Sequence, residues 1–567
     1  MPDFYVPSGE WILREGALGN EIEEMRLQVI NLHDEHREAA GESTATTSNL
    51  TAERRRALRE IHDQAKDVSD PSTIVYVQGD KESLYCAMRR DQLQASINKE
   101  LSNPAYTKLT PEEARKQLTL MARELRKHVK LGDEENHCSP GEVRFISNTF
   151  PVEDGKARPA RLKITAKTHK RINPSSNTPV PLRIILDNTN VAARGAQEYI
   201  ARMADQGMRE APSYVQDTAE AVSKIEALRP SPGCIIATAD VKDFYPSCPR
   251  EEALQAAYKT WMRHGPAKAK WLKDLTRIAS AGAVFENDRG EPYVLADGFG
   301  IGQCHSAQLC GIEYTLLESK VEARAIKAGI PVPLLYIRVQ DDILIIYDAG
   351  AENWAAYKEI FDKADTSGRR LEWEVSTKSV DWCDLTIHKG PRFLSGGALD
   401  LRLFIKPTDQ GTQLQRSSHH PEGTFKSILV GEASRLLINN SSEANWRTSL
   451  ARKAREFRSA GYSPTEIATH LLQARTFSQR PEALLKREVR RKRTKAEKQA
   501  AQQEGGKLIA YKLNYTPRET EMNMPGLIRE LHEWATEQPR MGEHASNTRF
   551  VACHLRSTSI GNKAQPW

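Results

Sequence analysis

The chain has 567 residues, of which 39% are hydrophobic and 28% are charged, and its formal net charge is +6. This length accommodates roughly three to four domains, and the composition is that of a soluble globular protein. No apolar run approaches the roughly 18 to 20 residues that cross a bilayer, and residues 1–20 lack the apolar core of a signal peptide. We therefore expect an intracellular protein without a membrane partner.

The eight cysteines form no Cys-x-x-Cys pair. Their scatter argues against a disulfide framework or a zinc ribbon and suits a reducing compartment. His137-Cys138 and Cys553-His554 are isolated dyads, and neither has the spacing of a four-ligand zinc site.

Helical patterns dominate the first part of the chain. A period of 3.6 residues predicts helices at 19–40 and 50–68, with a Ser/Thr-rich linker at 43–48 between them. Residues 73–77 predict a strand, and helical patterns return from 89 to 130.

Two strands rich in lysine and arginine come next. Residues 161–170 and 180–186 read as strands joined by a Pro/Asn/Ser-rich turn, and they carry Lys167 and Arg183. Such cations suit a hairpin laid over phosphate groups. An ordinary surface hairpin with exposed cations is the alternative, and the pattern by itself favours that alternative.

Two acidic clusters lie on apolar strands. Residues 234–240 form an apolar run that ends at Asp240, with Tyr245 five positions later, and residues 336–346 predict a hairpin whose tip carries Asp341 and Asp342. Adjacent anions between buried strands need neutralisation, which a divalent metal supplies. Taken alone, the tandem is more typical of a solvated turn than of a metal site.

A glycine-rich loop lies between the acidic clusters. Residues 298–303 read Gly-Phe-Gly-Ile-Gly-Gln, and a helix is expected at 304–324. Glycines before a helix allow backbone to approach a base pair or a phosphate, although a plain loop is the simpler interpretation. A Rossmann site is disfavoured because the strand-then-helix fingerprint and its acidic residue are missing.

The last part of the chain changes from mixed to helical structure. The patterns predict a helix at 352–364, strands at 371–375, 384–388 and 399–405, and helices from 421 to 475 with a stop at 461–464. This order indicates an α+β core followed by an all-helical part. The basic run at 486–495 suits a nuclear-import signal, a phosphate-contacting helix or a solvated face.

The spacing of the carboxylates suggests a reaction. If Asp240 and Asp341 face each other across adjacent strands, they can hold two Mg²⁺ ions about 3.5 to 4 Å apart. One ion would activate an attacking 3′-hydroxyl and the other would neutralise a leaving pyrophosphate. Magnesium prefers a few carboxylates plus substrate oxygens, so a sparse protein shell is expected. Lys167 and Arg183 could hold the triphosphate.

These motifs resemble those of reverse transcriptases in order and spacing. Residues 240–245 resemble motif A, residues 298–303 motif B and residues 339–342 motif C. The resemblance implies an α+β right-hand polymerase, with a palm of antiparallel sheet backed by helices. The implied parts are an N-terminal helical arm and linker (1–70), fingers (71–225), the palm with a primer-grip hairpin (226–405), a helical thumb with the basic run (406–500) and a C-terminal extension (501–567).

Several shorter segments narrow the resemblance to Penelope-like retroelement reverse transcriptases. Their shared order, from about residue 50 almost to the end, carries the similarity. The segments are Asp80-Lys81, 101–109, 167–170, 383–387, 405–409 and 418–421.

The resemblance also implies roles for single residues. It makes Asp240 and Asp341 the metal ligands with Asp342 a weaker third, and it adds Val241 to the metal and nucleotide site. It makes Tyr245 the steric gate against a ribose 2′-hydroxyl, unless this ring is a plain core aromatic. It places the nucleotide against Lys167, Arg183, Gly302 and Gln303. It makes Lys378 a candidate acid for pyrophosphate, although a plain surface lysine fits as well.

Three positions depart from the family pattern. Val339 stands in place of Tyr, Gln303 in place of Ser or Thr, and Ala166 in place of Pro. None removes a metal ligand, so we expect retained catalysis with altered fidelity or nucleotide handling. The sequence given ends without the nuclease domain of many Penelope-like elements, so we expect priming from an existing 3′ end or a nuclease in trans.

The sequence thus predicts an RNA-directed DNA polymerase of a Penelope-like retrotransposon. It would extend a DNA or RNA primer on an RNA template with dNTPs and two Mg²⁺ ions, in the nucleus. The first alternative is a host-domesticated reverse transcriptase with telomere-like or template-independent extension. A non-catalytic RNA-binding derivative and a viral RNA-dependent RNA polymerase are further alternatives, and the oligomeric state is open.

Overall fold

The structure is a computed structural model of the whole chain. It describes residues 74–80, 85–150, 156–167, 179–281, 283–365, 367–407, 409, 411–418 and 420–489, together with the backbone of 4–5, 507–514 and 548–555 and the single residues 529, 530, 533 and 537. The helices expected at 19–40 and 50–68, the basic run beyond residue 489, Lys81 and residues 168–170 lie outside this description.

A four-stranded antiparallel sheet carries both acidic motifs. Its order is β10 (Leu335–Val339), β11 (Asp342–Tyr347), β7 (Ile235–Val241) and β12 (Leu371–Ser376). The β10–β11 hairpin and β7 confirm the two strand predictions around the carboxylates. Alternate residues of β7 enter two different cores, because both faces of the sheet are covered, and this explains the continuous apolar run.

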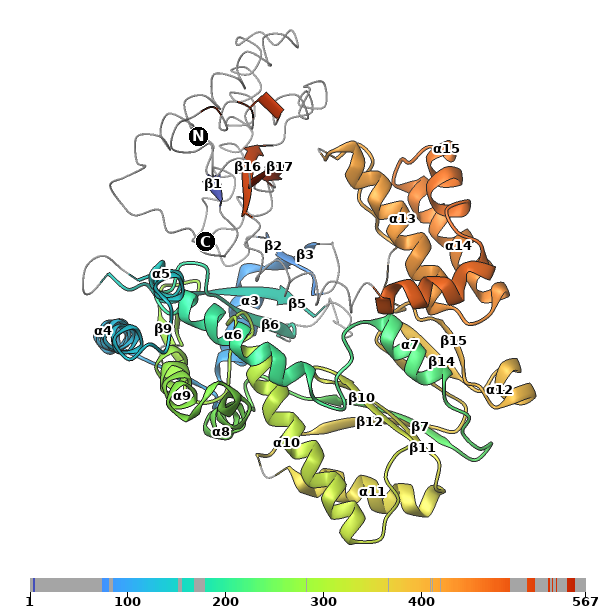
Figure 1. Cartoon of the computed structure of the whole chain (residues 1–567), viewed down its shortest axis with the longest axis horizontal. Helices are drawn as coiled ribbons and strands as arrows, with labels where there is room; N and C mark the ends of the chain where they lie inside the picture. Colours follow the sequence, from blue (N-terminus) through green and yellow to red (C-terminus); the bar gives the residue numbers. More distant parts are fainter. Residues whose placement is uncertain are drawn as a thin grey trace.

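Helices cover one face of this sheet, and a second sheet covers part of the other. The helical side contains α6 (Arg194–Arg209), α8 (Arg250–Trp261), α9 (Pro266–Ala281), α10 (Ser306–Lys327) and α11 (Ala351–Ala364). The other side contains α7 (Thr218–Glu226), β13 (Ser379–Trp382), β14 (Leu385–His388), α12 (Pro391–Gly396) and β15 (Asp400–Leu403). Figure 1 shows α10 and α11 beneath the sheet.

A five-stranded sheet forms the second part of the molecule. Its order is β4 (Tyr106–Lys108), β9 (Pro292–Leu295), β8 (Val284–Glu286), β5 (Ala160–Ala166) and β6 (Leu182–Asp187). The antiparallel β5–β6 pair confirms the predicted Lys/Arg-rich hairpin. The hairpin of β2 (Ile74–Gln78) and β3 (Tyr85–Arg89) lies beside it.

The helical pattern expected from 89 to 130 is interrupted in the structure. It divides into α3 (Arg90–Leu101), strand β4 and α4 (Pro111–Glu134), and α5 (Pro140–Ser147) follows. The helices α3 and α4 confirm the predicted helical patterns, and they are separated where Asn103 precedes a proline, which disfavours helical backbone. Thr110 then starts α4 with a capping box and Pro111 in the first turn.

A helical unit with its own core completes the described chain. It contains α13 (Glu422–Asn439), α14 (Glu443–Ser459), α15 (Pro464–Ile467), the short turns η2 (Ala468–Leu472) and η3 (Phe477–Gln479), and a helix at 480–489. The predicted stop at 461–464 is confirmed, since Gly461 has a φ of +89°. The break at Asn440 was missed, and its cause is tertiary: the Asn440 amide oxygen accepts from the Leu403 N–H of β15.

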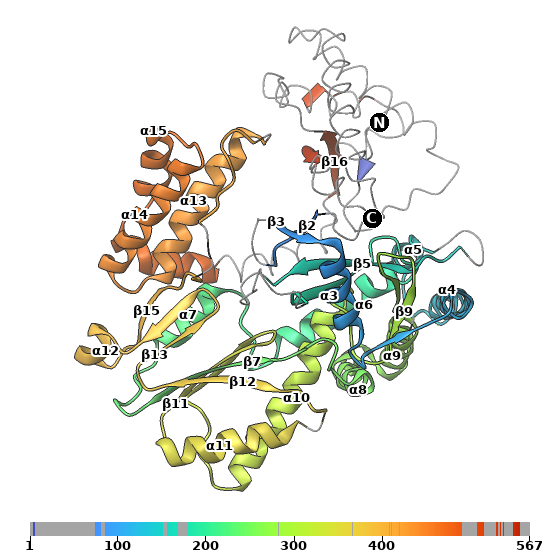
Figure 2. The same ribbon diagram turned by 180° about the vertical axis from the view of Figure 1, so that it is seen from behind.

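The arrangement is that of a right hand. In Figure 1, and from behind in Figure 2, the sheet of β10, β11, β7 and β12 forms the base, with β2, β3, β5 and β6 on one side and α13–α15 on the other. This confirms the α+β class with an antiparallel sheet backed by helices. Strands β1 (Phe4–Tyr5), β16 (Lys507–Asn514) and β17 (Thr548–Leu555) pair with one another. Among the described helices, none is both long and apolar enough to cross a bilayer.

Candidate active site

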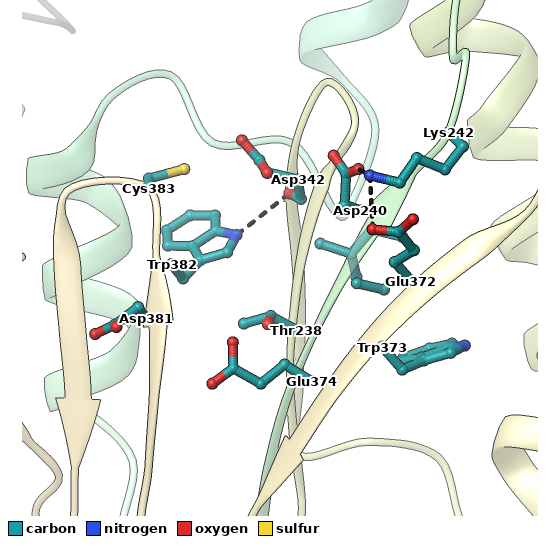
Figure 3. A pocket seen from close by; sticks show the side chains of 12 residues that line it. Thr238, Asp240, Lys242, Asp342, Glu372, Trp373, Glu374, Asp381, Trp382 and Cys383 are labelled. Atoms are coloured by element: carbon teal, nitrogen blue, oxygen red, sulfur yellow. Dashed lines mark hydrogen bonds and ion pairs between the residues drawn. The ribbon is translucent and has the colours of Figure 1, made fainter. Parts of the chain in front are cut away.

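Three carboxylates form a row across three neighbouring strands. Asp342 is paired directly with Asp240, and Asp240 is paired directly with Glu372 on its other side. Directly opposed residues share a face of the sheet with Cβ atoms about 4.5–5.5 Å apart. Asp341 lies in the hairpin turn, and its carbonyl accepts the Val241 N–H at 3.1 Å. The structure therefore brings together the carboxylates that the sequence separates by about a hundred residues (Figure 3).

A buried arginine holds the turn that carries Asp341. Gln340 has a φ of +54°, the left-handed region that a glutamine rarely occupies. Arg338, only 6% exposed, donates from Nη1 to the Gln340 carbonyl at 2.8 Å and from Nε to Glu318 Oε1 at 2.6 Å. The sequence analysis gave Arg338 no role. The signal that could have indicated its role was a charged residue at an inward-facing position of an apolar strand.

A second buried ion pair lies beside the first. Arg369 contacts Glu313 and Asp365 at 2.6 Å each. The ring of Tyr314 has the guanidinium groups of Arg338 and Arg369 at 4.9 and 5.1 Å from its centroid, and burial raises the pKa of its hydroxyl. These charges are compensated by hydrogen bonds, so the network fixes α10 against the strand and turn that carry the site.

Lys242 is the cation of the carboxylate row. Its ammonium donates to Asp240 Oδ2 and lies 2.7 Å from Glu372 Oε2. Partial burial lowers the pKa of Lys242, but the hydrogen bonds to the two carboxylates outweigh burial, and the net pKa is raised. Sequence reasoning missed Lys242. Its spacing of two residues from Asp240 on a strand was the available signal, because such residues share a face.

An open pocket of about 360 Å³ lies over the row. Five of its lining residues are acidic, namely Asp240, Asp342, Glu372, Glu374 and Asp381, and Lys242 is its basic residue. Trp382 lines it too, and its indole N–H donates to the Asp342 carbonyl at 3.3 Å, as Figure 3 shows. Negative charge therefore dominates a solvent-accessible pocket.

The β13–β14 turn also lies at this pocket. Cys383 occupies the turn with a φ of +50°. Burial raises the pKa of its thiol to about 12, and the charge of Asp342 adds to the rise. The β13–β14 turn, which belongs to the expected primer-grip hairpin, is thus adjacent to the carboxylates.

The carboxylates of the site suit a magnesium ion whose remaining ligands would be oxygens of the substrate. Within the described ranges, no three His, Cys, Asp or Glu side chains converge as a closed metal site. Magnesium commonly takes one or two protein carboxylates and completes its shell with water and phosphate oxygens. Asp240, Asp341 and Asp342 suit that chemistry. The Val241 side chain is buried in the core, so this residue can contribute only backbone atoms.

Tyr245 lies between the carboxylates and the Lys/Arg-rich hairpin. Burial raises the pKa of Tyr245 to about 12, and the nearby charge of Asp341 adds to this rise. Arg183 and Arg338 act on it in the opposite direction. The Tyr245 carbonyl accepts the Phe299 N–H at 2.9 Å, which joins motif A to the glycine-rich loop.

Two glycines of the glycine-rich loop lie close against the backbone of neighbouring segments. A Cβ at Gly302, whose φ is +103°, would lie 2.2 Å from the Leu186 carbonyl oxygen, and one at Gly298 would lie 2.1 Å from that of Pro246. The glycines therefore let this loop approach strand β6 and the turn after motif A.

Gln303 supports the loop from inside the protein. It is 5% exposed, and its amide oxygen accepts the Gly300 N–H at 2.7 Å. Its contact with a nucleotide stays a prediction, as does that of Gly302.

The expected triphosphate-binding cations lie at one end of the β5–β6 hairpin. Arg183 is paired with Thr165, and the N–H of Lys167 donates to the Pro181 carbonyl at 2.9 Å. Arg183 Nε lies 3.1 Å from Oδ1 of Asp80, a residue for which the sequence suggested no role beyond a motif match.

Lys378, the candidate acid for pyrophosphate, lies apart from this group in the structure. Glu372 is paired with Asp240, and β12 runs from there to Ser376, which is paired with Ile236. Lys378 follows six residues after Glu372, roughly 20 Å along an extended strand. It is an exposed residue of the β12–β13 turn, at the opposite end of β7 from Asp240.

Comparison with known proteins finds structural likeness at low identity. Telomerase from Candida albicans in complex with a fragment of telomeric RNA has a TM-score of 0.46 at 10% identity, over 84% of this chain and 73% of that one. Apo telomerase from Candida tropicalis has 0.42 at 12%, over 70% and 66%. The RNA-dependent RNA polymerase of a human picobirnavirus has 0.39 at 13%, over 74% and 85%. No protein-family model and no curated protein matches the sequence. Similarity at this level does not determine the activity of this chain.

Proposed function

We propose that the chain is an RNA-directed DNA polymerase of the reverse-transcriptase type. The observation that carries the proposal is the direct pairing of Asp342 with Asp240, with Asp341 in the adjoining turn and its charge close to Tyr245. Two-metal nucleotidyl transfer needs carboxylates at the junction of two strands, open to substrate on one side. The carboxylate row and its pocket meet both needs.

Each element has a task in this reaction. Asp240 and Asp341, supported by Asp342 and the Val241 backbone, would hold two Mg²⁺ ions, which would activate the 3′-hydroxyl of the primer and neutralise charge on the leaving pyrophosphate. Lys167 and Arg183 would bind the triphosphate. Tyr245 would occupy the space of a ribose 2′-hydroxyl and so select dNTPs. The β13–β14 turn would support the primer end beside the row.

The finer identity is also a proposal. The motif order supports a reverse transcriptase of a Penelope-like retrotransposon that uses an RNA template and a DNA or RNA primer in the nucleus, with any nuclease supplied in trans. A domesticated enzyme with telomere-like or template-independent extension uses the same site. Extension without template would identify the latter.

Primer extension tests the proposal. An oligo(dT) primer on poly(rA) with Mg²⁺ is expected to incorporate dTTP far better than UTP, because Tyr245 excludes the 2′-hydroxyl. Asp341→Ala is expected to lower incorporation by at least ~100-fold, since electrostatic stabilisation of the transition state is lost. Glu374→Ala is the matched control, because this exposed carboxylate lines the pocket over the carboxylate row but is not an expected metal ligand.

Three outcomes would contradict the proposal. Incorporation that survives Asp341→Ala would exclude the two-metal mechanism at this row. Equal use of UTP and dTTP would favour an RNA polymerase. RNA binding without incorporation on any template would favour the non-catalytic alternative.

A further inference from the structure

A buried carboxylate outside the catalytic row contacts one of the expected triphosphate ligands. Asp80 follows strand β2 and is 7% exposed. A buried carboxylate is costly unless it is paired. Its Oδ1 lies 3.1 Å from Arg183 Nε, while Oδ2 is buried without a hydrogen-bond partner in the described part of the chain. Among the described residues, Arg183 therefore provides the charge compensation of Asp80.

Asp80 contacts both arms of the β5–β6 hairpin. Its backbone N–H donates to the Ala166 carbonyl on β5 at 2.6 Å, while its side chain contacts Arg183 on β6. Ala166 is paired with Leu182, so both contacts occur at the same end of the hairpin. Lys167 is the next residue after Ala166. One residue thus contacts the Arg183 side chain and the backbone of the residue that precedes Lys167.

The contact leaves part of the guanidinium available. Arginine has five N–H groups, and the ion pair with Asp80 is made at Nε, whose N–H has no hydrogen-bond partner among the described residues. The Arg183 side chain is 34% exposed, and its charge acts on Tyr245, beside Asp341. A long cation that is held in place loses less conformational entropy when it binds phosphate than a free one. The pair therefore prepares Arg183 for a second anion on its exposed side.

We propose that Asp80 is a positioning residue that holds Arg183 for the triphosphate of the incoming nucleotide. The inference rests on the proposed function. It makes the β2–β3 hairpin part of the nucleotide site, through a carboxylate that touches no substrate itself. Asp80 acts only through Arg183, and this dependence can be measured.

A double-mutant cycle in the full chain provides the test. The variants are Asp80→Asn, Arg183→Ala and their combination, assayed by dTTP titration in primer extension on poly(rA). Asp80→Asn is expected to raise KM for dTTP about tenfold with little change in kcat, because misplaced binding groups weaken substrate positioning. In the Arg183→Ala background, Asp80→Asn is expected to add no further rise in KM.

Asp187→Asn is the matched control. Asp187 ends β6 at the opposite end of the same hairpin and pairs with Lys163 at 2.9 Å. Its substitution also removes a carboxylate from the hairpin, but KM for dTTP is expected to stay unchanged. Thermal unfolding of all variants separates loss of fold from loss of positioning.

Two results would overturn the inference: an unchanged KM in Asp80→Asn, or an effect of equal size with and without Arg183. The wild-type chain separates these results from failure of the proposed function. If the wild type incorporates no nucleotide, binding of dTTP by the same four proteins replaces KM, with the same two overturning outcomes.

Discussion

Two basic side chains contact the carboxylate-bearing strands from opposite faces of the sheet. Lys242 pairs with Asp240 and Glu372 on the face of the open pocket. Arg338 lies on the face covered by α10 and holds the Gln340 carbonyl. The Lys242 ammonium faces the open pocket, where a metal ion would compete with it for Asp240. The buried Arg338 guanidinium is instead paired with Glu318.

Lys242 is expected to compete with metal for Asp240. Replacing it by methionine removes an ammonium from the carboxylate row, so the affinity for Mn²⁺ as a probe of the Mg²⁺ site should rise about fivefold, the equivalent of ~1 kcal/mol for a partly exposed ion pair. Mn²⁺ titration followed by electron paramagnetic resonance measures this without catalysis. Lys358→Met, which removes a lysine paired with Asp362 on α11, should leave the affinity unchanged. Weaker Mn²⁺ binding in Lys242→Met would show that the lysine supports the site.

At the scale of elements, the glycine-rich loop and the start of α10 form one buried junction. The Ile301 carbonyl accepts the Leu186 N–H at 2.7 Å, so the loop is bonded to β6. His305 is fully buried before α10, where its Nε2 lies 2.8 Å from Ser280 Oγ. The junction thus joins the palm sheet, α9 and the Lys/Arg-rich hairpin.

His305 makes this junction sensitive to acid. Burial lowers its pKa from the ordinary 6.5 to about 3, and the charge of Arg250 acts in the same direction. Between these values the unfolded chain binds a proton that the folded chain does not. The contribution of His305 to stability is therefore complete above pH 6.5 and is lost as the pH falls toward 3, by up to ~1.4 kcal/mol per pH unit.

The histidine substitution isolates this effect. The free energy of unfolding in urea should fall more between pH 7.5 and pH 5 in the wild type than in His305→Gln, because other titrating groups are common to both. An identical decrease in both proteins would exclude His305 as the cause.

At the scale of the whole molecule, one glutamate connects the helical unit to the sheet. Glu226 at the end of α7 pairs with Arg392 of α12 and, at 2.9 Å, with Arg480. Arg480 also donates to the carbonyls of Leu437 and Ile438 in α13. This buried arginine therefore links α7 to the helix at 480–489 and to α13.

Removing this link should loosen the helical unit. Arg480→Met is expected to cost about 3 kcal/mol, because it leaves two carbonyls and part of a buried charge without their partner. Hydrogen exchange should increase in α13 more than in β7. Arg447→Met removes an exposed pair with Glu443 on α14 and should have little effect on either measurement. Equal exchange in wild type and Arg480→Met would contradict the linking role.

Local patterns in the sequence determined the elements that carry the site. Apolar alternation around Asp341 predicted the hairpin, and the run before Asp240 predicted its strand, because these signals depend only on neighbours along the chain. The same holds for the Lys/Arg-rich hairpin. The motif order further suggested which carboxylates belong together.

Only the tertiary structure decided which side chains meet. Register between strands about a hundred residues apart placed Asp342 and Glu372 on either side of Asp240, and the direction of β12 placed Lys378 at the far end. Buried partners such as Arg338 and Asp80 depend on contacts that no local pattern contains. Strand pairing and burial are long-range properties, so the sequence determined the elements and the fold decided their partners.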